Sequence, residues 1–304
     1  MENSGSKKGD RIAKVMARAG VASRREVERM IEAGRVSVNG KVIESPALNV
    51  TEADKISLDN EPIAEPEHAR LWLYYKPLGL VTSNSDEKDR QTVFDTLPEE
   101  IGRVLSVGRL DINSEGLLLL TNDGGIKRKL ELPSTGWLRR YRVRVNGRPT
   151  EETFAPLRKG ITLEGEKFQP MHITLDRQQG ANAWLTVSIR EGKNREIRRA
   201  MDAVGLSVNR LLRVSYGPFR LGELKPGELE EVKTRVLRDQ LGLEGEDAAP
   251  KPNPVRKRKG PPSKSTPRPR GTEIEPPTRR GAPAKRGKGA AQRPTGKPRG
   301  KPRV

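Results

Sequence analysis

The sequence lacks several residue types that would point to particular chemistries. It contains no cysteine, which excludes disulfide bonds and thiolate metal sites. Its two histidines, His68 and His172, lie far apart, so no metal site is predicted. No apolar run approaches the roughly 20 residues that span a bilayer, and the polar N-terminal residues do not resemble a signal peptide. These absences predict a soluble, cytoplasmic protein that enters no membrane.

Positive charge is abundant but unevenly distributed. The chain has 304 residues and a formal net charge of +19, with 59 Lys and Arg against 40 Asp and Glu. Residues 251–304 hold 18 basic and 2 acidic residues, whereas residues 1–250 hold 41 and 38. A length of this order suits two modest domains, and the basic excess predicts a polyanionic partner, most simply nucleic acid.

The C-terminal segment, residues 244–304, is rich in proline, glycine, lysine and arginine and has no aromatic residue. Such a composition cannot bury enough apolar surface to offset the entropy of the chain. We predict a disordered polycationic tail that raises affinity for RNA without reading its sequence.

Residues 10–58 are typical of a small helix-hairpin module. Apolar residues share one face of a first helix within 12–19. Ser23 and Glu26 form a capping box at the start of a second helix, 24–33. Asn39-Gly40 between alternating apolar residues predicts a β-hairpin.

The polar face of this module carries several basic residues, which are either solvated charges or RNA contacts. Its segments Ser-Arg-Arg-Glu and Gly-Arg-Val-x-Val-Asn-Gly resemble those of the S4 RNA-binding domain. That resemblance implies a module that binds structured RNA through contacts to the RNA backbone and through the shape of the RNA. The implied RNA-binding residues are Arg18, Arg24, Arg25, Arg35 and Lys41.

A linker is predicted over residues 59–70, which contain two prolines, and a second domain over 71–243. Strand patterns recur through this second domain, at 71–75, 104–107, 117–121, 140–145, 171–175, 183–190 and 207–216. Tyr75-Lys76-Pro77 ends the first of these strands. Proline cannot donate to a ladder, so Lys76-Pro77 is consistent with a strand end.

Asp111 follows an apolar residue within the turn-rich stretch Gly108–Leu117. A poorly solvated carboxylate is more reactive and can act as a nucleophile. The other interpretation is a turn residue that bonds its own backbone. Spacing does not decide between the two.

The stretch Gly-Arg-Leu-Asp-x-x-Ser-x-Gly-Leu-Leu resembles the signature of a family of ribosomal pseudouridine synthases, whose A type belongs to the small and whose B type belongs to the large ribosomal subunit. The resemblance covers about residues 10–240 and implies that Asp111 is the nucleophile. It implies an α+β catalytic domain with a mixed, mainly antiparallel sheet, in which the element ending at Lys76-Pro77 has a structural role. The implied reaction, uridine to pseudouridine, needs no cofactor.

The same resemblance assigns roles to other residues. Glu191–Arg199 is similar to the family element Glu-Gly-x-Asn-Arg-(Gln/Glu)-(Ile/Val)-Arg-Arg, which implies that Arg198 pairs with Asp111. It also implies that Tyr141, in a predicted strand, stacks on the target base. Arg109 would fill the gap that a flipped base leaves in the RNA, and Leu212 is a candidate for the wall of the pocket, with a place in the core as its alternative.

The resemblance is closest to the B type, which implies ribosomal RNA as the partner, with a 23S rRNA substrate either free or in a pre-ribosomal particle. Alternatives are a 16S rRNA synthase and a non-catalytic S4-type ribosome assembly factor. Monomer is the default oligomeric state. The sequence departs from relatives at Glu131, where histidine is common and to which no role is assigned, and at Ser114-Glu115.

Overall fold

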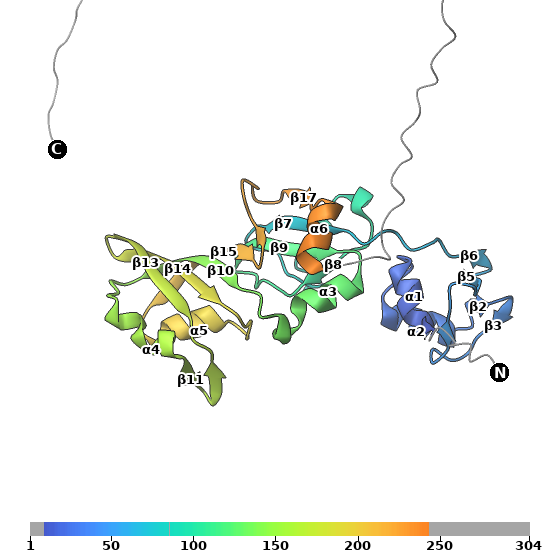
Figure 1. Ribbon diagram of the computed structural model, residues 1–304, viewed down its shortest axis with the longest axis horizontal. Coiled ribbons are helices and arrows are strands. Elements are labelled where there is room, and N and C mark those ends of the chain that lie inside the picture. The colour runs from blue at the N-terminus through green and yellow to red at the C-terminus, as the bar shows by residue number, and fades with distance from the viewer. Residues whose placement is uncertain (1–8, 85, 243–304) are drawn as a thin grey trace, which may run out of the picture. The chain divides into compact units, whose positions relative to one another are not determined.

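The computed structural model describes residues 9–84 and 86–242, which form a small N-terminal module and a larger domain (Figure 1). The predicted tail at 244–304 lies outside the described residues. Within the described part, no helix is long and apolar enough to cross a membrane.

The N-terminal module has the predicted helices and hairpin. Ser23 begins the second helix and its Oγ accepts from the Glu26 amide at 3.2 Å, as the capping box requires. Asn39 and Gly40 both have positive φ, 52° and 80°, which suits the turn that closes the hairpin. The elements are β1 (Asp10–Arg11), α1 (Ile12–Arg18), α2 (Arg24–Glu32), β2 (Val36–Val38), β3 (Lys41–Val42), β4 (Asn49–Val50), β5 (Ile56–Leu58) and β6 (Glu61–Pro62).

Strand β6 occupies the first residues of the predicted linker. Asp59 and Asn60 have φ of 51° and 69°, and this two-residue turn pairs β6 with β5 at the edge of the sheet β3-β2-β5-β6. Pro62 is tolerated there because an edge strand need not donate on its outer side. The connection between module and domain is therefore shorter than predicted.

The larger domain is built on one mixed sheet in the order β13-β14-β10-β15-β9-β7-β17, with β16 beside β15 and β8 beside β9. Strands β9 and β15 pair in parallel, and the other pairs of this sheet are antiparallel. The predicted α+β fold is confirmed. Its strands are β7 (Leu71–Lys76), β8 (Leu105–Val107), β9 (Glu115–Thr121), β10 (Arg139–Asn146), β13 (His172–Gln179), β14 (Asn182–Ile189), β15 (Ser207–Tyr216), β16 (Phe219–Arg220) and β17 (Leu229–Glu231).

Helices and short turns pack on this sheet. They are η1 (Phe94–Thr96), η2 (Glu99–Ile101), α3 (Gly124–Glu131), η3 (Pro133–Thr135), η4 (Glu152–Phe154), α4 (Ala155–Lys159), α5 (Glu196–Ala203) and α6 (Thr234–Leu241), with a separate hairpin of β11 (Ile161–Leu163) and β12 (Glu166–Phe168).

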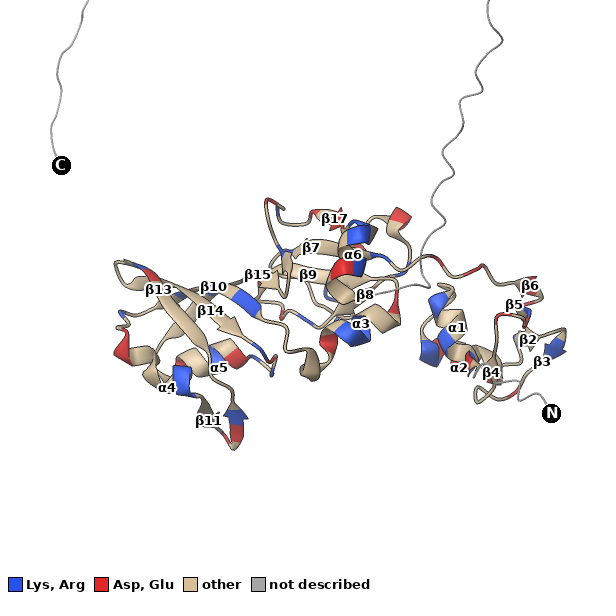
Figure 2. Ribbon diagram, in the orientation of Figure 1, with Lys and Arg blue, Asp and Glu red and all other residues tan. Residues whose placement is uncertain are grey.

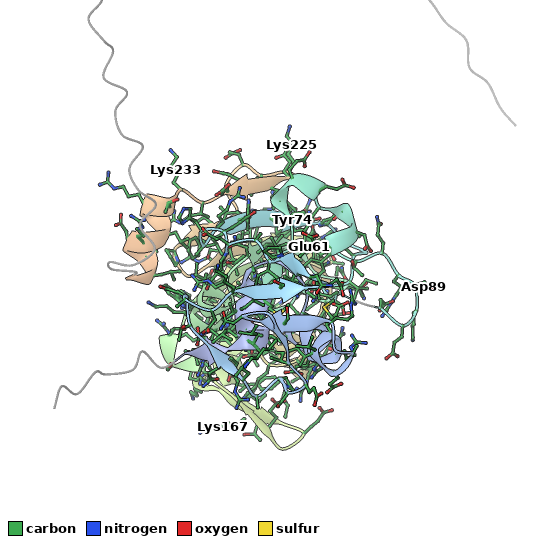
Figure 3. All side chains as sticks on the ribbon, turned by 90° about the vertical axis from the view of Figure 1, so that its right-hand side faces the viewer. Glu61, Tyr74, Asp89, Lys167, Lys225 and Lys233 are labelled. Carbon is green, nitrogen blue, oxygen red and sulfur yellow. The ribbon has the colours of Figure 1, made fainter. Side chains whose placement is uncertain are left out.

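Two apolar clusters lie on opposite faces of the sheet. On β9, Leu118 and Leu120 belong to the cluster that includes α4 and α5, whereas Leu117 and Leu119 belong to the cluster that includes α3 and α6. Tyr74 is fully buried, while the side chains of Lys225 and Lys233 point outward (Figure 3). Packing on both faces thus buries the strands from which the loops of the site begin.

Candidate active site

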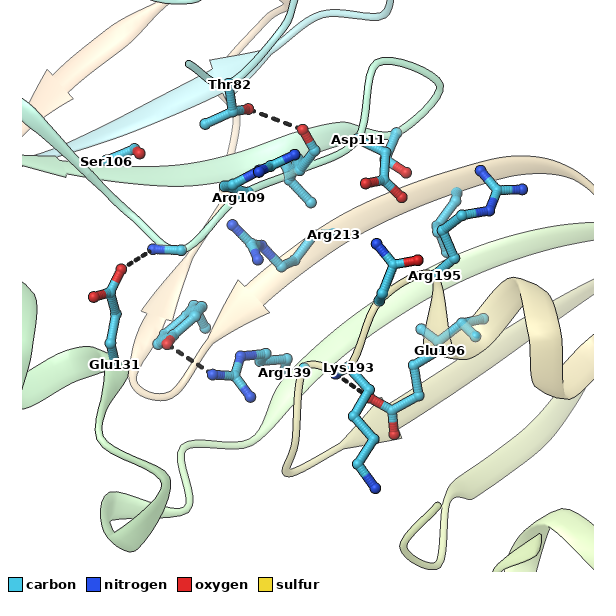
Figure 4. A pocket seen from close by; sticks show the side chains of 18 of the residues that line it. Thr82, Ser106, Arg109, Asp111, Glu131, Arg139, Lys193, Arg195, Glu196 and Arg213 are labelled. Atoms are coloured by element: carbon cyan, nitrogen blue, oxygen red, sulfur yellow. Dashed lines mark hydrogen bonds between the residues drawn. The ribbon is translucent and has the colours of Figure 1, made fainter. Parts of the chain in front are cut away.

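A cavity of about 720 Å³ lies in the larger domain, between the loop that carries Asp111 and the loop that precedes α5 (Figure 4). Three residues singled out from the sequence line it, namely Arg109, Asp111 and Tyr141. Arg198 and Leu212 are not among its lining residues.

The Asp111 loop is anchored first through its own backbone and its neighbours. The Ser114 amide donates to the Asp111 carbonyl at 2.9 Å, closing a turn. The Gly79 amide donates to the Ile112 carbonyl at 2.9 Å, and Thr82 Oγ1 donates to the Leu110 carbonyl at 2.9 Å (Figure 4). The main chain on both sides of the carboxylate is therefore fixed.

Three long side chains complete this anchoring. Lys76 Nζ donates to the Ser114 carbonyl at 2.9 Å, and Arg198 Nη2 donates to the Asn113 carbonyl at 2.7 Å. Glu131 Oε1 accepts from the Gly108 amide at 2.6 Å (Figure 4). Glu131, to which no role was assigned from the sequence, thus secures the start of the loop and also lines the cavity.

Lys76 is the buried cation beneath this loop. It is fully buried, and burial lowers the pKa of its ammonium to about 8, against the opposing attraction of Asp111 and Glu115. Its place at the end of β7 agrees with a structural role. Its charge interaction with Asp111 was not foreseen from the sequence.

Arg198 differs from its expected role. We expected its guanidinium to pair with the Asp111 carboxylate, but its two hydrogen bonds go to the carbonyls of Asn113 and Val208, at 2.7 and 3.0 Å. Burial is the main cause that lowers the pKa of Arg198, followed by Arg195, and the charge of Asp111 opposes that change. Arg198 therefore holds the loop through hydrogen bonds to its backbone, and its charge also interacts with that of Asp111.

Tyr141 forms a wall of the cavity. It lies on β10, is 7% exposed, and its hydroxyl makes no hydrogen bond within the described part of the chain. Because Tyr141 lines the cavity, its hydroxyl is available to a molecule bound there.

The prediction for Leu212 as a pocket wall is wrong by one position. On β15 it lies opposite Arg142, whereas Leu211 lies opposite Val143. Adjacent strand residues point to opposite faces, so Leu211 lines the cavity and Leu212 packs with the cluster on the other face. Two adjacent leucines gave no signal by which to choose between them.

The loop before α5 contributes residues that were missed. Helix α5 begins at Glu196, and Arg195 before it adopts a left-handed conformation with φ of 49°, which is uncommon for a residue other than glycine. Arg195 is exposed and lines the same cavity as Asp111 (Figure 4). The unusual backbone conformation lies in the loop that borders the cavity.

Glu196 lies under the same loop. It is 3% exposed, and its Oε2 accepts from the Lys193 amide at 3.0 Å. Burial is the main cause that raises the pKa of Glu196 to about 8, and the neighbouring Glu191 carboxylate adds to it. A proton on Glu196 therefore favours the folded loop near neutral pH.

Two arginines enclose the ring of Tyr216 at the far end of the cavity. The Arg139 and Arg213 guanidinium carbons lie 4.8 and 5.3 Å from the ring centroid, and Arg139 Nη2 donates to the Tyr216 hydroxyl at 3.0 Å. Arg213 is 3% exposed. Together with Arg109 and Arg195, they make the cavity attractive to a polyanion.

The basic residues predicted on the N-terminal module do not line the cavity. All five are exposed, on α1, on α2, directly before β2 and on β3 (Figure 2). One of them, Arg35, is paired through two hydrogen bonds with Asp59, at 2.9 and 2.5 Å. The five residues are Arg18, Arg24, Arg25, Arg35 and Lys41.

Comparisons with known proteins agree with this architecture. Residues 70–203 match the family model described as RNA pseudouridylate synthase, and residues 10–56 match the S4 domain. A crystal structure of a pseudouridylate synthase is similar with a TM-score of 0.55 and 26% identity, covering 76% of this chain and 99% of that chain.

Similar sequences carry related names. An uncharacterized RNA pseudouridine synthase of Rickettsia prowazekii is 44% identical, covering 76% of this chain and 97% of its own length. Ribosomal large subunit pseudouridine synthase B of Haemophilus influenzae is 42% identical, and the match covers 78% of this chain and 70% of that protein. The protein of the same name in Shigella flexneri is 41% identical, and the match covers 79% of this chain and 86% of that protein.

Proposed function

Because this chain belongs to the RNA pseudouridine synthase family, we propose that it isomerises one uridine of 23S ribosomal RNA to pseudouridine. The observation that carries this proposal is Asp111, facing the cavity from a loop whose main chain is anchored on both sides of it. The names of the large-subunit relatives support the choice of RNA.

The reaction needs a base removed from its stack. Flipping a uridine costs a few kcal/mol of lost stacking, and a contact between a base and an aromatic ring returns about 1–3 kcal/mol. Tyr141 supplies that ring at the cavity wall. Arg109, exposed at the rim, is placed to fill the gap in the RNA.

In the chemistry, Asp111 attacks the sugar carbon, or abstracts a sugar proton so that a glycal-like intermediate forms. The glycosidic carbon–nitrogen bond breaks, the uracil turns, and a carbon–carbon bond forms to the same sugar, with no group gained or lost. The Tyr141 hydroxyl holds the base or moves a proton. Arg198 positions the loop through the Asn113 carbonyl, and the buried Lys76 ammonium holds it through the Ser114 carbonyl.

The S4 module adds affinity outside the cavity. Its exposed basic residues Arg24, Arg25 and Lys41 contact phosphates and so position the RNA without specifying the base. Arg18 contributes less, because Asp123 Oδ2 lies 3.4 Å from its Nε. Arg35 contributes less, because Asp59 already holds its guanidinium. Ribosomal RNA as substrate makes the cytoplasm the place of action.

The test maps pseudouridine by carbodiimide modification and reverse transcription in rRNA from cells that lack this chain. We expect one 23S stop to disappear and to return with the wild-type gene but not with Asp111→Asn, which removes the charge with little change of shape. A lost 16S stop would instead make 16S rRNA the substrate. Unchanged stops, with binding retained, would make the chain an assembly factor that does not catalyse.

A further inference from the structure

One face of the sheet in the larger domain carries a cluster of arginines. Along β10 the buried Tyr141, Val143 and Val145 face the cluster of α4 and α5. The alternate residues Arg140 and Arg142 are exposed, so they point away from that side.

Neighbouring strands bring further residues to the same face. Arg144 and Arg177 lie on either side of Trp184, opposite it on β10 and β13 respectively. Trp184 is half-buried, and the Arg142 guanidinium carbon lies 5.2 Å from its ring centroid. We call this set, Arg140, Arg142, Arg144, Arg177 and Trp184, the arginine face.

The positive charge of the arginine face is only partly compensated. Asp176 Oδ2 lies 4.0 Å from Arg142 Nε and accepts from Thr186 Oγ1 at 2.9 Å, so it offsets one of the four guanidinium charges. Arg144 Nε is buried and has no hydrogen-bond partner in the part of the chain that the structure describes. Arg177 donates to the neutral Gln179 amide oxygen at 3.2 Å.

The arginine face is distinct from the cavity. Tyr141, Ile189 and Leu211 line the cavity from one side of the sheet, and the strand alternation sets the arginine face on the other side. An RNA segment held in the cavity leaves the arginine face open to a different segment.

We propose that the arginine face binds the phosphate backbone of an RNA segment outside the catalytic cavity. Planar guanidinium groups bind phosphates in a fixed geometry, and an adjacent aromatic ring with arginines is the usual composition of a surface for single-stranded RNA. The strand register fixes the spacing of the backbone positions that carry these cations. The proposal rests on the proposed function only in taking RNA as the polyanion.

The experiment measures binding of a long 23S fragment and of a minimal stem-loop, both with Asp111→Asn protein to prevent turnover. The test variant is Arg140→Gln/Arg142→Gln/Arg177→Gln, three exposed positions. The matched control is Lys225→Gln/Lys233→Gln/Arg235→Gln, which removes equal charge from exposed positions elsewhere.

For the long fragment we expect the test variant to lose about tenfold or more in affinity at low salt, and the salt slope to fall by about 2, as for three lost phosphate contacts. The minimal stem-loop should bind almost unchanged. Equal losses in test and control variants, or an equal loss for the stem-loop, would overturn the proposal.

A second measurement uses the wild-type protein and so does not depend on the folding of a variant. Ultraviolet crosslinking to the long fragment should give a crosslink within residues 174–186, which include Trp184 and contain no residue that lines the cavity. Crosslinks confined to peptides of the cavity would overturn the proposal. Pseudouridine formation by the same preparation tests the proposed function separately, so the two can fail independently.

Discussion

The Arg198 guanidinium donates to the Asn113 carbonyl at 2.7 Å, two residues beyond the proposed nucleophile. Helix α5 thereby fixes the loop that carries Asp111, without a direct hydrogen bond to the carboxylate. Arg198 thus positions the backbone of the loop through hydrogen bonds, in addition to its charge interaction with Asp111.

Arg198→Lys keeps the charge but loses the planar fork that reaches two carbonyls. We expect kcat to fall about 10- to 100-fold with little change in KM, because misplacement of a reacting group affects the chemical step. Single-turnover rates measure this. Arg199→Lys is the control, since Arg199 pairs instead with Glu164 and Glu166. Equal losses in both variants would contradict a positioning role for Arg198.

Tyr141→Phe separates the ring from the hydroxyl. Because this hydroxyl has no hydrogen-bond partner within the described residues, we expect it to serve the substrate, and its removal to lower kcat about 100-fold or more with RNA affinity retained. Tyr75→Phe is the matched control, since the Tyr75 hydroxyl donates to Glu115 at 3.1 Å and does not line the cavity. Full activity of Tyr141→Phe would leave stacking as the only role of Tyr141.

Gly116 in the signature is required by the backbone. Its φ is 97°, and a Cβ there would overlap the Arg213 carbonyl oxygen and Leu212 Cδ1. We expect Gly116→Ala to reduce the free energy of unfolding by about 3 kcal/mol or more, from strain and overpacking together. Urea denaturation measures it. Gly124→Ala, where nothing lies within 4 Å of the added Cβ, should change stability by less than about 1 kcal/mol.

Glu196 should make stability depend on pH. Burial raises its pKa to about 8 from an ordinary value of 4.5, so between these values the folded state holds a proton that the unfolded state releases. The contribution of Glu196 to stability therefore falls as pH rises through that window. Glu196→Gln cannot titrate and should gain stability relative to wild type from pH 5 to 8.

Thermal midpoints of both proteins over that range test the role of Glu196. Glu164→Gln serves as control because the Glu164 side chain is 83% exposed. A constant difference between wild type and Glu196→Gln at every pH would mean that Glu196 is ionised throughout.

Several features follow from local sequence because they depend on near neighbours. The Asn39-Gly40 hairpin and the Ser23 cap form as predicted, since turn and cap chemistry is decided within a few residues. Asp111 lies in the cavity, and its signature is long enough to identify the family. The same rule of turn chemistry applies to the Asp59-Asn60 turn, which lies within the segment predicted as a linker.

Other features were decided only by tertiary structure, because they join residues remote in the chain. Side chains alternate along a strand, so Leu211 and Leu212 must point to opposite faces of the sheet. Only the pairing of β15 with β10 shows which of the two leucines points into the cavity. Likewise, no local pattern brings Lys76, Glu131 and Arg198 to the backbone of one loop. The sequence alone determined which carboxylate belongs to the signature. The packed sheet decided which side chains hold it, since long-range contacts fix the orientation of each strand.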